Sequence, residues 1–278
     1  MNEVIQKGLF PDVEKWLLED DLNRNIHYVR TLPSHPVELT LKFKSPLLIA
    51  GMDYFCAVFS YLGEDVSELL ALEGKEFAKP EAVVLTKKLP FNVAVTGERL
   101  ALNLLQHGSS IATWTKKHVS LSGSTKILDT RKTTPGLRGL EKYAVRVGGG
   151  FNHRLGQTDL WMIKDNHKSS LGGLKGAYEF FVSQGTFYNN IIAEIHDLKE
   201  LSEAITLGIK HVMLDNFSPD QIREAVKLKT SGMTIEVSGG IRLETMKDFL
   251  IPGVDALSIG ALTYSAPKVD ISLKYRSV

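Results

Sequence analysis

The stretch HVMLDNFSPDQIREAVKLKTSGMTIEVSGG, residues 211–240, contains two short apolar segments separated by an amphipathic one. The apolar segments, 211–216 and 234–240, have the length of strands and are rich in valine, leucine, isoleucine and methionine. Between them, Ser218 followed by proline is typical of a helix start, because serine caps free amide groups and proline fits the first helical position. The stretch therefore predicts a strand, a helix and a second strand, the repeating unit of a parallel sheet.

The same alternation continues on both sides of this stretch. Four further apolar runs of strand length occur, namely KILDT (126–130), LWMIKDN (160–166), NIIAEIH (190–196) and ALSIGA (256–261). Apolar residues recur at helical spacing in 171–185 and 197–208, where Gly208 suits the C-terminal cap, and we expect another helix in 243–253. Six almost wholly apolar strands that alternate with helices favour a closed or nearly closed α/β barrel.

The first hundred residues have a different pattern. Hydrophobic and polar residues alternate in 36–51, which predicts a half-solvated antiparallel strand. We expect a helix in 65–72, further strand in 81–95 and a long amphipathic helix in 97–119.

These patterns predict an α/β protein of two domains. Residues 1–105 would form an N-terminal α/β sandwich, and the alternating tail 266–278 would return to its sheet. Residues 106–265 would form the α/β barrel domain. We expect the catalytic residues in the second domain, because polar side chains at the C-terminal ends of barrel strands face the active site.

Composition excludes several classes of protein. Of 278 residues, 43% are hydrophobic and 23% charged, and the net charge of +1 gives no overall nucleic-acid footprint. The only cysteine, Cys56, lies in an apolar run, so we expect a core residue in a reducing compartment. The longest apolar run, 47–62, is interrupted by Asp53 and is too short to span a membrane, and no signal-peptide pattern opens the chain. We therefore expect a cytoplasmic protein that binds neither membrane nor nucleic acid.

Positive charge is nevertheless concentrated at the predicted strand ends and the loops beside them. The basic residues concerned are Arg99, Arg131, Lys132, His153, Arg154 and Lys164. Such a cluster would repel itself unless an anionic ligand were bound. Arginine forms planar bidentate contacts with carboxylates and phosphates, whereas lysine acts as a point charge. The cluster therefore predicts a ligand, or a pair of ligands, with several negative groups.

Two acidic residues and two glycine-rich segments lie among these cations. Glu194 and Asp215 end strands, and carboxylate oxygens with room for substrate phosphates are typical of a Mg²⁺ site. The segments 237–241 and 258–262 would let backbone N–H groups approach a phosphate closely.

Several of these residues also have a purely structural interpretation. Asp129 is equally consistent with a structural ion pair to Arg131, and His153 with a hydrogen-bonded loop residue. For four other residues we favour a structural role: His167 as a helix cap or an exposed residue, His118 as a solvated residue, and Trp114 and Trp161 as packing residues.

Six blocks carry a family resemblance: GERLALNLLQ, ILDTRKTTPGLRGLEKYAVRVGGGFNHRLG, IKDNH, MLDNF, VSGGI and SIGALT. Over roughly residues 97–265 the chain resembles the quinolinate phosphoribosyltransferase family. The resemblance implies a type II phosphoribosyltransferase, with an N-terminal α/β sandwich and an incomplete α/β barrel. It also implies a homodimer with shared active sites. The implied reaction joins quinolinate and phosphoribosyl pyrophosphate, with Mg²⁺, to give nicotinate mononucleotide, pyrophosphate and CO₂ in NAD biosynthesis.

The resemblance also implies roles for individual residues. The two carboxylates of quinolinate would be bound by Arg131, His153, Arg154 and Lys164, while Arg99 would reach into the neighbouring subunit's site. Lys132 would contact the pyrophosphate or ribose, and the 5′-phosphate would lie on Ser238, Gly239, Gly260 and Ala261. The ribose hydroxyls and Mg²⁺ would be held by Glu194 and Asp215, which with Lys132 and Lys164 make up the implied catalytic residues.

The sequence departs from the family pattern at four places. The block LEDDLNRNIHYVR (18–30) lacks the usual glycines, His196 stands where an acid is expected, and Tyr264 stands where histidine is common. In addition, Ser109-Ser110 stands where Ser-Gly is more usual. Two other functions remain open: a nicotinate phosphoribosyltransferase, and an anion-binding or transport-associated protein on the same scaffold. Arg131, Arg154 and Lys164 together favour a dicarboxylate, and the intact DTRKT block favours an enzyme.

Overall fold

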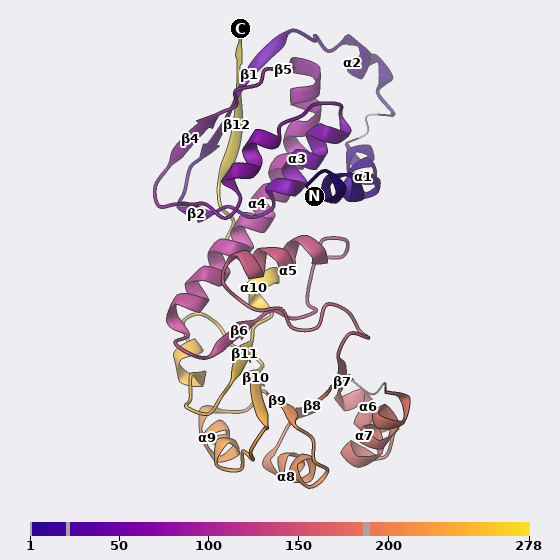
Figure 1. Cartoon of the computed structure of the whole chain (residues 1–278), viewed down its shortest axis with the longest axis vertical. Helices are drawn as coiled ribbons and strands as arrows, with labels where there is room; N and C mark the ends of the chain where they lie inside the picture. The colour runs from indigo at the N-terminus through magenta and orange to yellow at the C-terminus, as the bar shows by residue number, and fades with distance from the viewer. Residues whose placement is uncertain (1, 21–22, 186–189) are drawn as a thin grey trace. The chain divides into compact units, whose positions relative to one another are not determined.

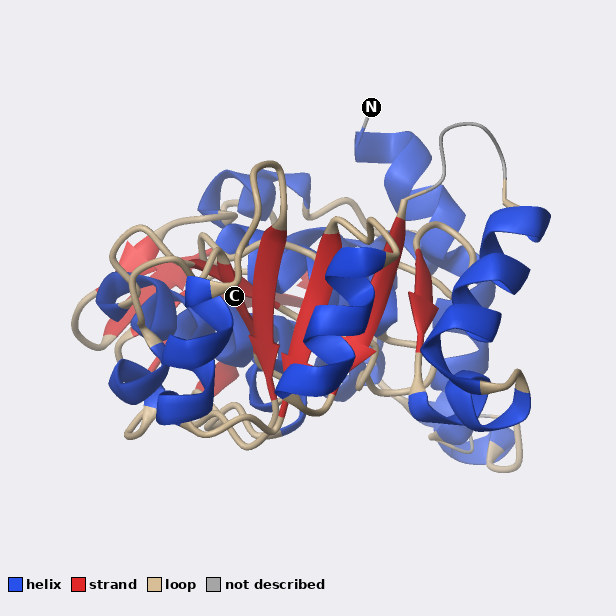
Figure 2. Ribbon diagram, turned by 90° about the horizontal axis from the view of Figure 1, so that it is seen from below, coloured by secondary structure: helices blue, strands red, loops and turns tan. Residues whose placement is uncertain are grey.

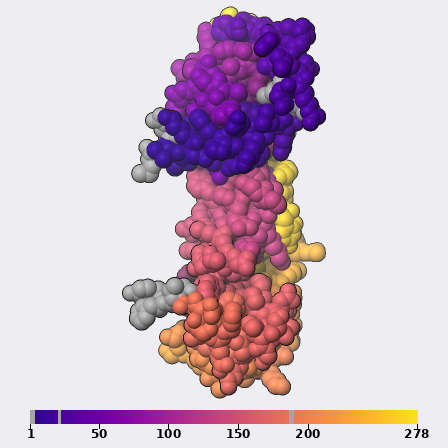
Figure 3. Space-filling model, turned by 90° about the vertical axis from the view of Figure 1, so that its right-hand side faces the viewer, coloured from indigo at the N-terminus to yellow at the C-terminus, as the bar shows by residue number. Residues whose placement is uncertain are grey.

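The computed structural model describes residues 2–20, 23–185 and 190–278. Two compact units make up the chain. Figures 1 and 3 colour the chain by residue number, from indigo at the N-terminus to yellow at the C-terminus. The first unit comprises Met1–Trp114, Gly139–Gly148 and Ala266–Val278, and the second comprises Thr115–Arg138 and Gly149–Ser265.

An antiparallel sheet forms the centre of the first unit. Strand β1 (Pro36–Phe43) pairs along nearly its whole length with β12 (Ile271–Ser277), which comes from the tail of the chain. On its other side β1 pairs with β4 (Glu81–Val84) and β5 (Leu89–Pro90). Side chains on β1 are alternately buried and more exposed, which confirms the predicted half-solvated strand.

Helices and a two-stranded ladder complete the first unit. They are α1 (Asn2–Glu19), α2 (Ile26–Thr31), α3 (Met52–Tyr61), the 3₁₀ helix η1 (Ser67–Leu72), α4 (Phe91–Leu121) as far as Trp114, α5 (Arg138–Val147), β2 (Leu47–Leu48) and β3 (Glu76–Phe77). Cys56 lies on α3 and is 1% exposed, which confirms its place in the core. Residue 105, our expected domain boundary, lies inside α4. Of the unusual block 18–30, residues 21 and 22 lie outside the described residues.

Three local predictions for the segment 65–118 are wrong. The segment 81–95 is not all strand, because α4 begins at Phe91, and the helix in 65–72 is only 3₁₀. His118 is not solvated but completely buried. The reason is its position on α4. Ile111, Thr115 and His118 are spaced three to four residues apart and are all fully buried, so they lie on the same inward face of the helix.

A six-stranded parallel sheet forms the second unit, in the order β6-β11-β10-β9-β8-β7. The strands are β6 (Lys126–Leu128), β7 (Trp161–Ile163), β8 (Ile191–Ile195), β9 (His211–Asp215), β10 (Thr234–Ser238) and β11 (Ala256–Ser258). Figure 2 shows neighbouring strand arrows pointing the same way, with helices lying over them. All six predicted strands are confirmed. In most of them, neighbouring residues that point to opposite faces of the sheet are both buried, as expected for a parallel sheet covered by helices.

The helices α6 (Asp165–Ser170), α7 (Gly173–Gln184), α8 (Leu198–Thr206) and α9 (Pro219–Lys227) connect these strands. As predicted, Ser218 caps α9, where its hydroxyl accepts from the Gln221 N–H, and Gly208 follows α8 with a φ of 73°. The helix expected in 243–253 is reduced to the 3₁₀ turn η2 (Met246–Phe249). Proline at position 252 disfavours helical backbone before it, so the turn does not extend.

The sheet remains open, because β6 and β7 lie at its two edges. Among the described residues no ladder joins these edges, although Phe151 forms an isolated bridge with Leu128 beside β6. This arrangement is the incomplete α/β barrel that the resemblance implied. None of the described helices combines the length and the apolar character needed to traverse a bilayer.

Candidate active site

The strand register aligns the polar residues of the second unit in two layers. Glu194 is paired with Met213, and Met213 with Glu236, across β8, β9 and β10. Two residues further along, Asp215 is paired with Ser238, and Ser238 with Ser258. Because side chains two residues apart lie on the same face of a strand, both layers face one side at the C-terminal edge of the sheet.

A cavity of about 330 Å³ lies at this edge. Its lining combines basic, acidic, hydroxyl and methionine side chains: Thr130, Arg131, Lys132, His153, Arg154, Met162, Lys164, Glu194, Met213, Asp215, Ser238 and Ser258. The structure thus brings together eight of the residues predicted from sequence. The lining residues Thr130, Met162, Met213 and Ser258 were missed, although their place near the ends of the predicted strands was a usable signal.

The other predicted site residues lie elsewhere. Arg99 belongs to the first unit, where it is exposed on α4. Gly239 follows β10 with a φ of 101°, and a Cβ there would lie 2.2 Å from Asn216 Oδ1. Gly260 and Ala261 begin the short helix α10 (Ala261–Tyr264), where a Cβ on Gly260 would lie 2.7 Å from the Tyr264 ring.

Backbone contacts hold the loop that carries Arg131 and Lys132. The Lys132 N–H donates to Thr130 Oγ1 (3.0 Å), and its carbonyl accepts from Thr263 Oγ1 (2.7 Å). Because these bonds use main-chain atoms of the loop, both basic side chains remain exposed and available to a ligand.

His153 is held in place by two acidic side chains. Asp129, which is completely buried, accepts from the His153 N–H (2.8 Å) and from the Asn152 amide (2.6 Å). The ring Nδ1 accepts from the Arg154 N–H (2.7 Å), and Nε2 lies 3.4 Å from Glu236 Oε1. The neutral ring therefore carries its proton on Nε2, facing Glu236. Asp129 thus holds the loop at 152–153, a role that sequence reasoning did not assign.

Arg154 is a mostly buried cation. One guanidinium nitrogen donates to the carbonyls of Leu160 (3.1 Å) and Gln157 (3.4 Å). Burial lowers the pKa of Arg154 and the charge of Arg131 lowers it further, against the opposing effect of Asp159 and other acids. The two arginines therefore repel each other, which is the predicted property of a site that binds anions.

The two acidic residues of the cavity have different partners. Glu194 Oε2 lies 2.6 Å from the Lys164 ammonium, whereas Asp215 Oδ2 accepts from the Asn216 amide (2.9 Å). Carboxylate oxygens suit Mg²⁺, and both residues line the cavity, so this donor set fits the ion. A second group, Asp165, Glu194 and His196, places ligand atoms within 4.8 Å of one another.

A neighbouring cavity of about 330 Å³ shares Arg131, Arg154, Met162 and Lys164 with the first. One of its walls is aromatic: the Trp161 and Phe181 rings meet edge to face with centroids 5.3 Å apart, so Trp161 packs as predicted. His167 confirms its predicted capping role, because its Nδ1 accepts from the Lys164 N–H (3.0 Å) at the start of α6.

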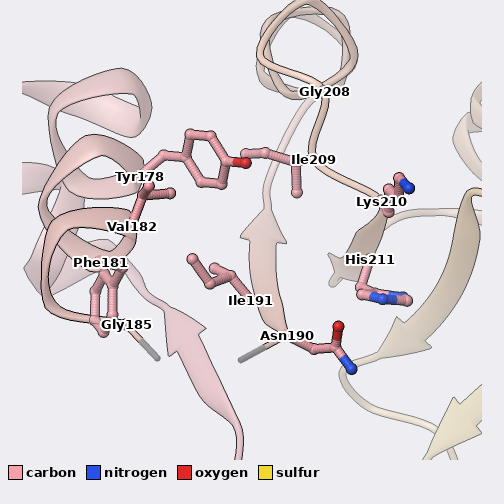
Figure 4. Close-up of a pocket in the computed structure, with 10 residues that line it drawn as sticks. All are labelled: Tyr178, Phe181, Val182, Gly185, Asn190, Ile191, Gly208, Ile209, Lys210 and His211. Carbon is pink, nitrogen blue, oxygen red and sulfur yellow. The ribbon is translucent and has the colours of Figure 1, made fainter. Parts of the chain in front are cut away.

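A further cavity, of about 250 Å³, lies at the opposite end of β8 and β9. Figure 4 shows Tyr178, Phe181 and Val182 on one side of it and Lys210 and His211 on the other. None of the residues predicted for the site lines this cavity.

Comparison with known proteins agrees with this geometry. The family model described as the quinolinate phosphoribosyl transferase C-terminal domain matches residues 111–274, and the N-terminal domain model matches residues 25–109. A probable nicotinate-nucleotide pyrophosphorylase (carboxylating) of Bacillus subtilis is 40% identical over 238 residues, covering 85% of this chain and 82% of that protein. The corresponding enzyme of Rattus norvegicus is 36% identical over 266 residues, covering 93% and 88%.

Solved structures give the same result. NadC from Streptococcus pyogenes superposes with a TM-score of 0.83 at 32% identity, covering 98% of both chains. The nicotinate-nucleotide pyrophosphorylase of Ehrlichia chaffeensis superposes with a TM-score of 0.85 at 28% identity, covering 96% of this chain and 98% of that one. Both family models and these relatives extend over most of the sequence, and the chain belongs to the quinolinate phosphoribosyltransferase family.

Proposed function

We propose that this protein transfers the phosphoribosyl group of phosphoribosyl pyrophosphate to quinolinate, releasing pyrophosphate and CO₂ and forming nicotinate mononucleotide for NAD biosynthesis. One observation carries the proposal for this member of the family: five basic side chains and two carboxylates line a single cavity at the C-terminal edge of the parallel sheet. Substrates with two carboxylates, a phosphate and a pyrophosphate match that excess of positive charge.

The basic residues would bind the dicarboxylate. Arg131, His153, Arg154 and Lys164 line the cavity together, and Arg154 is already fixed by its carbonyl contacts. A fixed guanidinium orients a carboxylate at little entropic cost. Lys132 is assigned to the pyrophosphate or ribose of the second substrate.

The acidic residues and glycines would bind the phosphoribosyl group. Glu194 and Asp215 would accept from the ribose hydroxyls, and backbone N–H groups near Ser238 and Gly239 would receive the 5′-phosphate, together with Gly260 and Ala261. Glu194 and Asp215 would also hold Mg²⁺, which when bound neutralises charge on the leaving pyrophosphate.

The reaction then needs no protein nucleophile. The bond between C1′ and the pyrophosphate oxygen breaks with its electron pair leaving on pyrophosphate, and the carboxylates of Glu194 and Asp215 stabilise the positive charge at C1′. The lone pair of the pyridine nitrogen forms the new bond to C1′. When CO₂ departs, its bonding electron pair stays on C2, where the positive charge of the resulting pyridinium stabilises it, and C2 then takes a proton from water. Lys164 would place its positive charge near the departing group.

We assign Arg99 to the active site of a second copy of the chain, which makes the functional unit a homodimer. Mixing Arg99→Ala with Lys132→Ala protein tests this assignment, because a mixed dimer contains one intact site. Recovery of about a quarter of wild-type activity is expected for random mixing, and no recovery excludes a shared site. The buried free thiol of Cys56 is compatible with the cytoplasm, where we place the enzyme.

The first experiment incubates the purified protein with Mg²⁺, phosphoribosyl pyrophosphate and either quinolinate or nicotinate. We expect nicotinate mononucleotide and one equivalent of CO₂ from quinolinate only. Product from nicotinate without CO₂ would instead identify a monocarboxylate phosphoribosyltransferase. Tight anion binding without turnover would identify a binding protein on the same scaffold.

A further inference from the structure

His196 lies beside Glu194, a residue that lines the active-site cavity, and the proposed mechanism does not use it. Its Nε2 atom is 2.5 Å from Asp165 Oδ1 and 3.6 Å from Glu194 Oε1. The other carboxylate oxygen of Glu194, Oε2, is 2.6 Å from Lys164 Nζ. The imidazole therefore stands between a carboxylate that lines the cavity, Glu194, and one that does not, Asp165.

Five further contacts fix the position of this group. The His196 N–H donates to Glu200 Oε2 (2.9 Å), and the Lys168 ammonium donates to both oxygens of Glu200 (2.9 Å each). Lys168 also lies 3.2 Å from Asp165 Oδ1 and donates to the Glu194 carbonyl (3.1 Å). Because the Lys168 side chain is only 8% exposed, these contacts are little screened by water. His196 is thereby tied to the start of α8 and to α6.

The imidazole separates two groups of like charge. Without it, the carboxylates of Asp165 and Glu194 would face each other across a small space and repel. The side chain of Glu194 would then turn away from Asp165, and the ammonium of Lys164 would lose the partner that holds it at the edge of the cavity. Lys164 is 45% exposed, so little else fixes its position.

We infer that His196 is a positioning residue for this active site. It fixes the carboxylate of Glu194, and through that carboxylate it sets the place at which Lys164 meets the substrate. The inference rests on the proposed function, because the residues that His196 positions, Glu194 and Lys164, are those proposed to bind the ribose and quinolinate. A displacement of such groups by about 1 Å can reduce turnover by up to two orders of magnitude.

Three substitutions of His196 in the full-length protein test this role. In His196→Ala we expect kcat/KM for quinolinate to fall on the order of 10- to 100-fold, mainly through KM, because Lys164 is displaced in the free enzyme. His196→Gln keeps an N–H donor and should recover most of that loss. His196→Glu adds a third carboxylate and should be the poorest of the three. The melting temperature of the alanine and glutamine variants should match that of the wild type.

A matched control comes from the same sheet. His211 begins β9, and its Nδ1 lies 2.9 Å from Thr234 Oγ1, away from the active-site cavity. His211→Gln should leave kcat/KM unchanged. If it does, a defect in the His196 variants cannot be attributed to the loss of any histidine contact in this sheet.

The outcomes separate a positioning role from a structural one. Wild-type kinetics in both the alanine and the glutamine variants would overturn the inference, as would equal losses in both accompanied by a lower melting temperature. Crystal structures of the wild type and His196→Ala give a readout that needs no turnover. Separation of Lys164 Nζ from Glu194 Oε2 in the variant supports the inference, and an unchanged ion pair overturns it. A wild-type protein that does not turn over quinolinate would refute the proposed function, and these crystal structures would still decide the role of His196.

Discussion

The two ends of the parallel sheet differ sharply, although the same strands form both. At the C-terminal edge, five basic side chains and two carboxylates line one cavity. At the N-terminal edge, the cavity beside β8 and β9 has the apolar wall of Tyr178, Phe181 and Val182, with Lys210 among its few charged groups. On β9, His211 and Asp215 mark the two ends, only about 13 Å apart at the usual rise per residue.

The difference follows from the direction of the strands. In a strand-helix repeat, the loops after the strands lead into helix N-termini, where free N–H groups favour anions. The loops at the opposite edge follow helix C-termini, whose free carbonyl oxygens carry partial negative charge and do not attract anions. The C-terminal edge can therefore bind a multiply charged substrate, whereas the N-terminal edge mainly joins and packs the elements.

Removal of a cavity cation should have the largest effect. In Arg131→Ala we expect kcat/KM for quinolinate to fall on the order of 10³-fold, because a carboxylate of the substrate loses its bidentate partner. The Arg131 side chain is exposed, so the melting temperature should not change. Steady-state kinetics together with thermal unfolding check both statements. Near wild-type kcat/KM would remove Arg131 from the binding site.

Gly239 offers a second test at the same edge. Gly239→Ala places a methyl group 2.2 Å from Asn216 Oδ1 at a φ of 101°, so we expect a loss of about 2–3 kcal/mol in the free energy of unfolding. Gly240→Ala is the matched control, because φ is 62° there and no atom lies within 4 Å of the added methyl group. It should cost only about 1 kcal/mol, mainly from backbone strain. Urea titrations of both variants measure the difference, and equal losses would show that contact with Asn216 has no effect.

Asp159 links the active-site loop to pH. Burial by itself would raise its pKa, but the N–H groups of Leu155 and Gly156 donate to its carboxylate and lower the pKa overall. An acid with a lowered pKa in the folded state contributes stability above its unfolded value, and that stability is lost as the pH falls through the folded pKa. The wild type should therefore lose slightly more unfolding free energy than Asp159→Asn between pH 6 and strong acid.

The expected difference is small, about 0.5 kcal/mol or less, because Asp159 is exposed to solvent. Urea midpoints measured at both pH values in both proteins provide the test. Asp220→Asn, a change at an exposed carboxylate on α9, serves as the control. A steeper acid dependence in Asp159→Asn than in the wild type would reverse the sign that we assign.

The smallest effect is expected at the opposite end of the sheet. Lys210 is exposed at the N-terminal edge, and Lys210→Ala removes a cation there just as Arg131→Ala does at the other edge. We expect kcat/KM within about twofold of the wild type and unfolding free energy within about 0.5 kcal/mol. A loss above tenfold in kcat/KM would show that the N-terminal edge of the sheet also contributes to substrate binding or catalysis.

Spacing and residue type along the chain are enough to predict the helices, the strands and the charged groups of the site. The six strands, the cap at Ser218 and the basic residues after β6 follow from spacing and local chemistry, which act over a few residues along the chain. The direction of parallel strands then predicted that Lys164, Glu194 and Asp215 would meet, because all strand C-termini share one edge.

Packing between distant segments determines which residues hold the side chains at that edge in place. Asp129 meets His153 across 24 positions of sequence, and Ser258 donates to Glu236 across 22. The burial of His118 and the contact of Gly239 with Asn216 likewise depend on packing between segments. Local propensity carries no information about such contacts, because they form only when distant segments pack in one register.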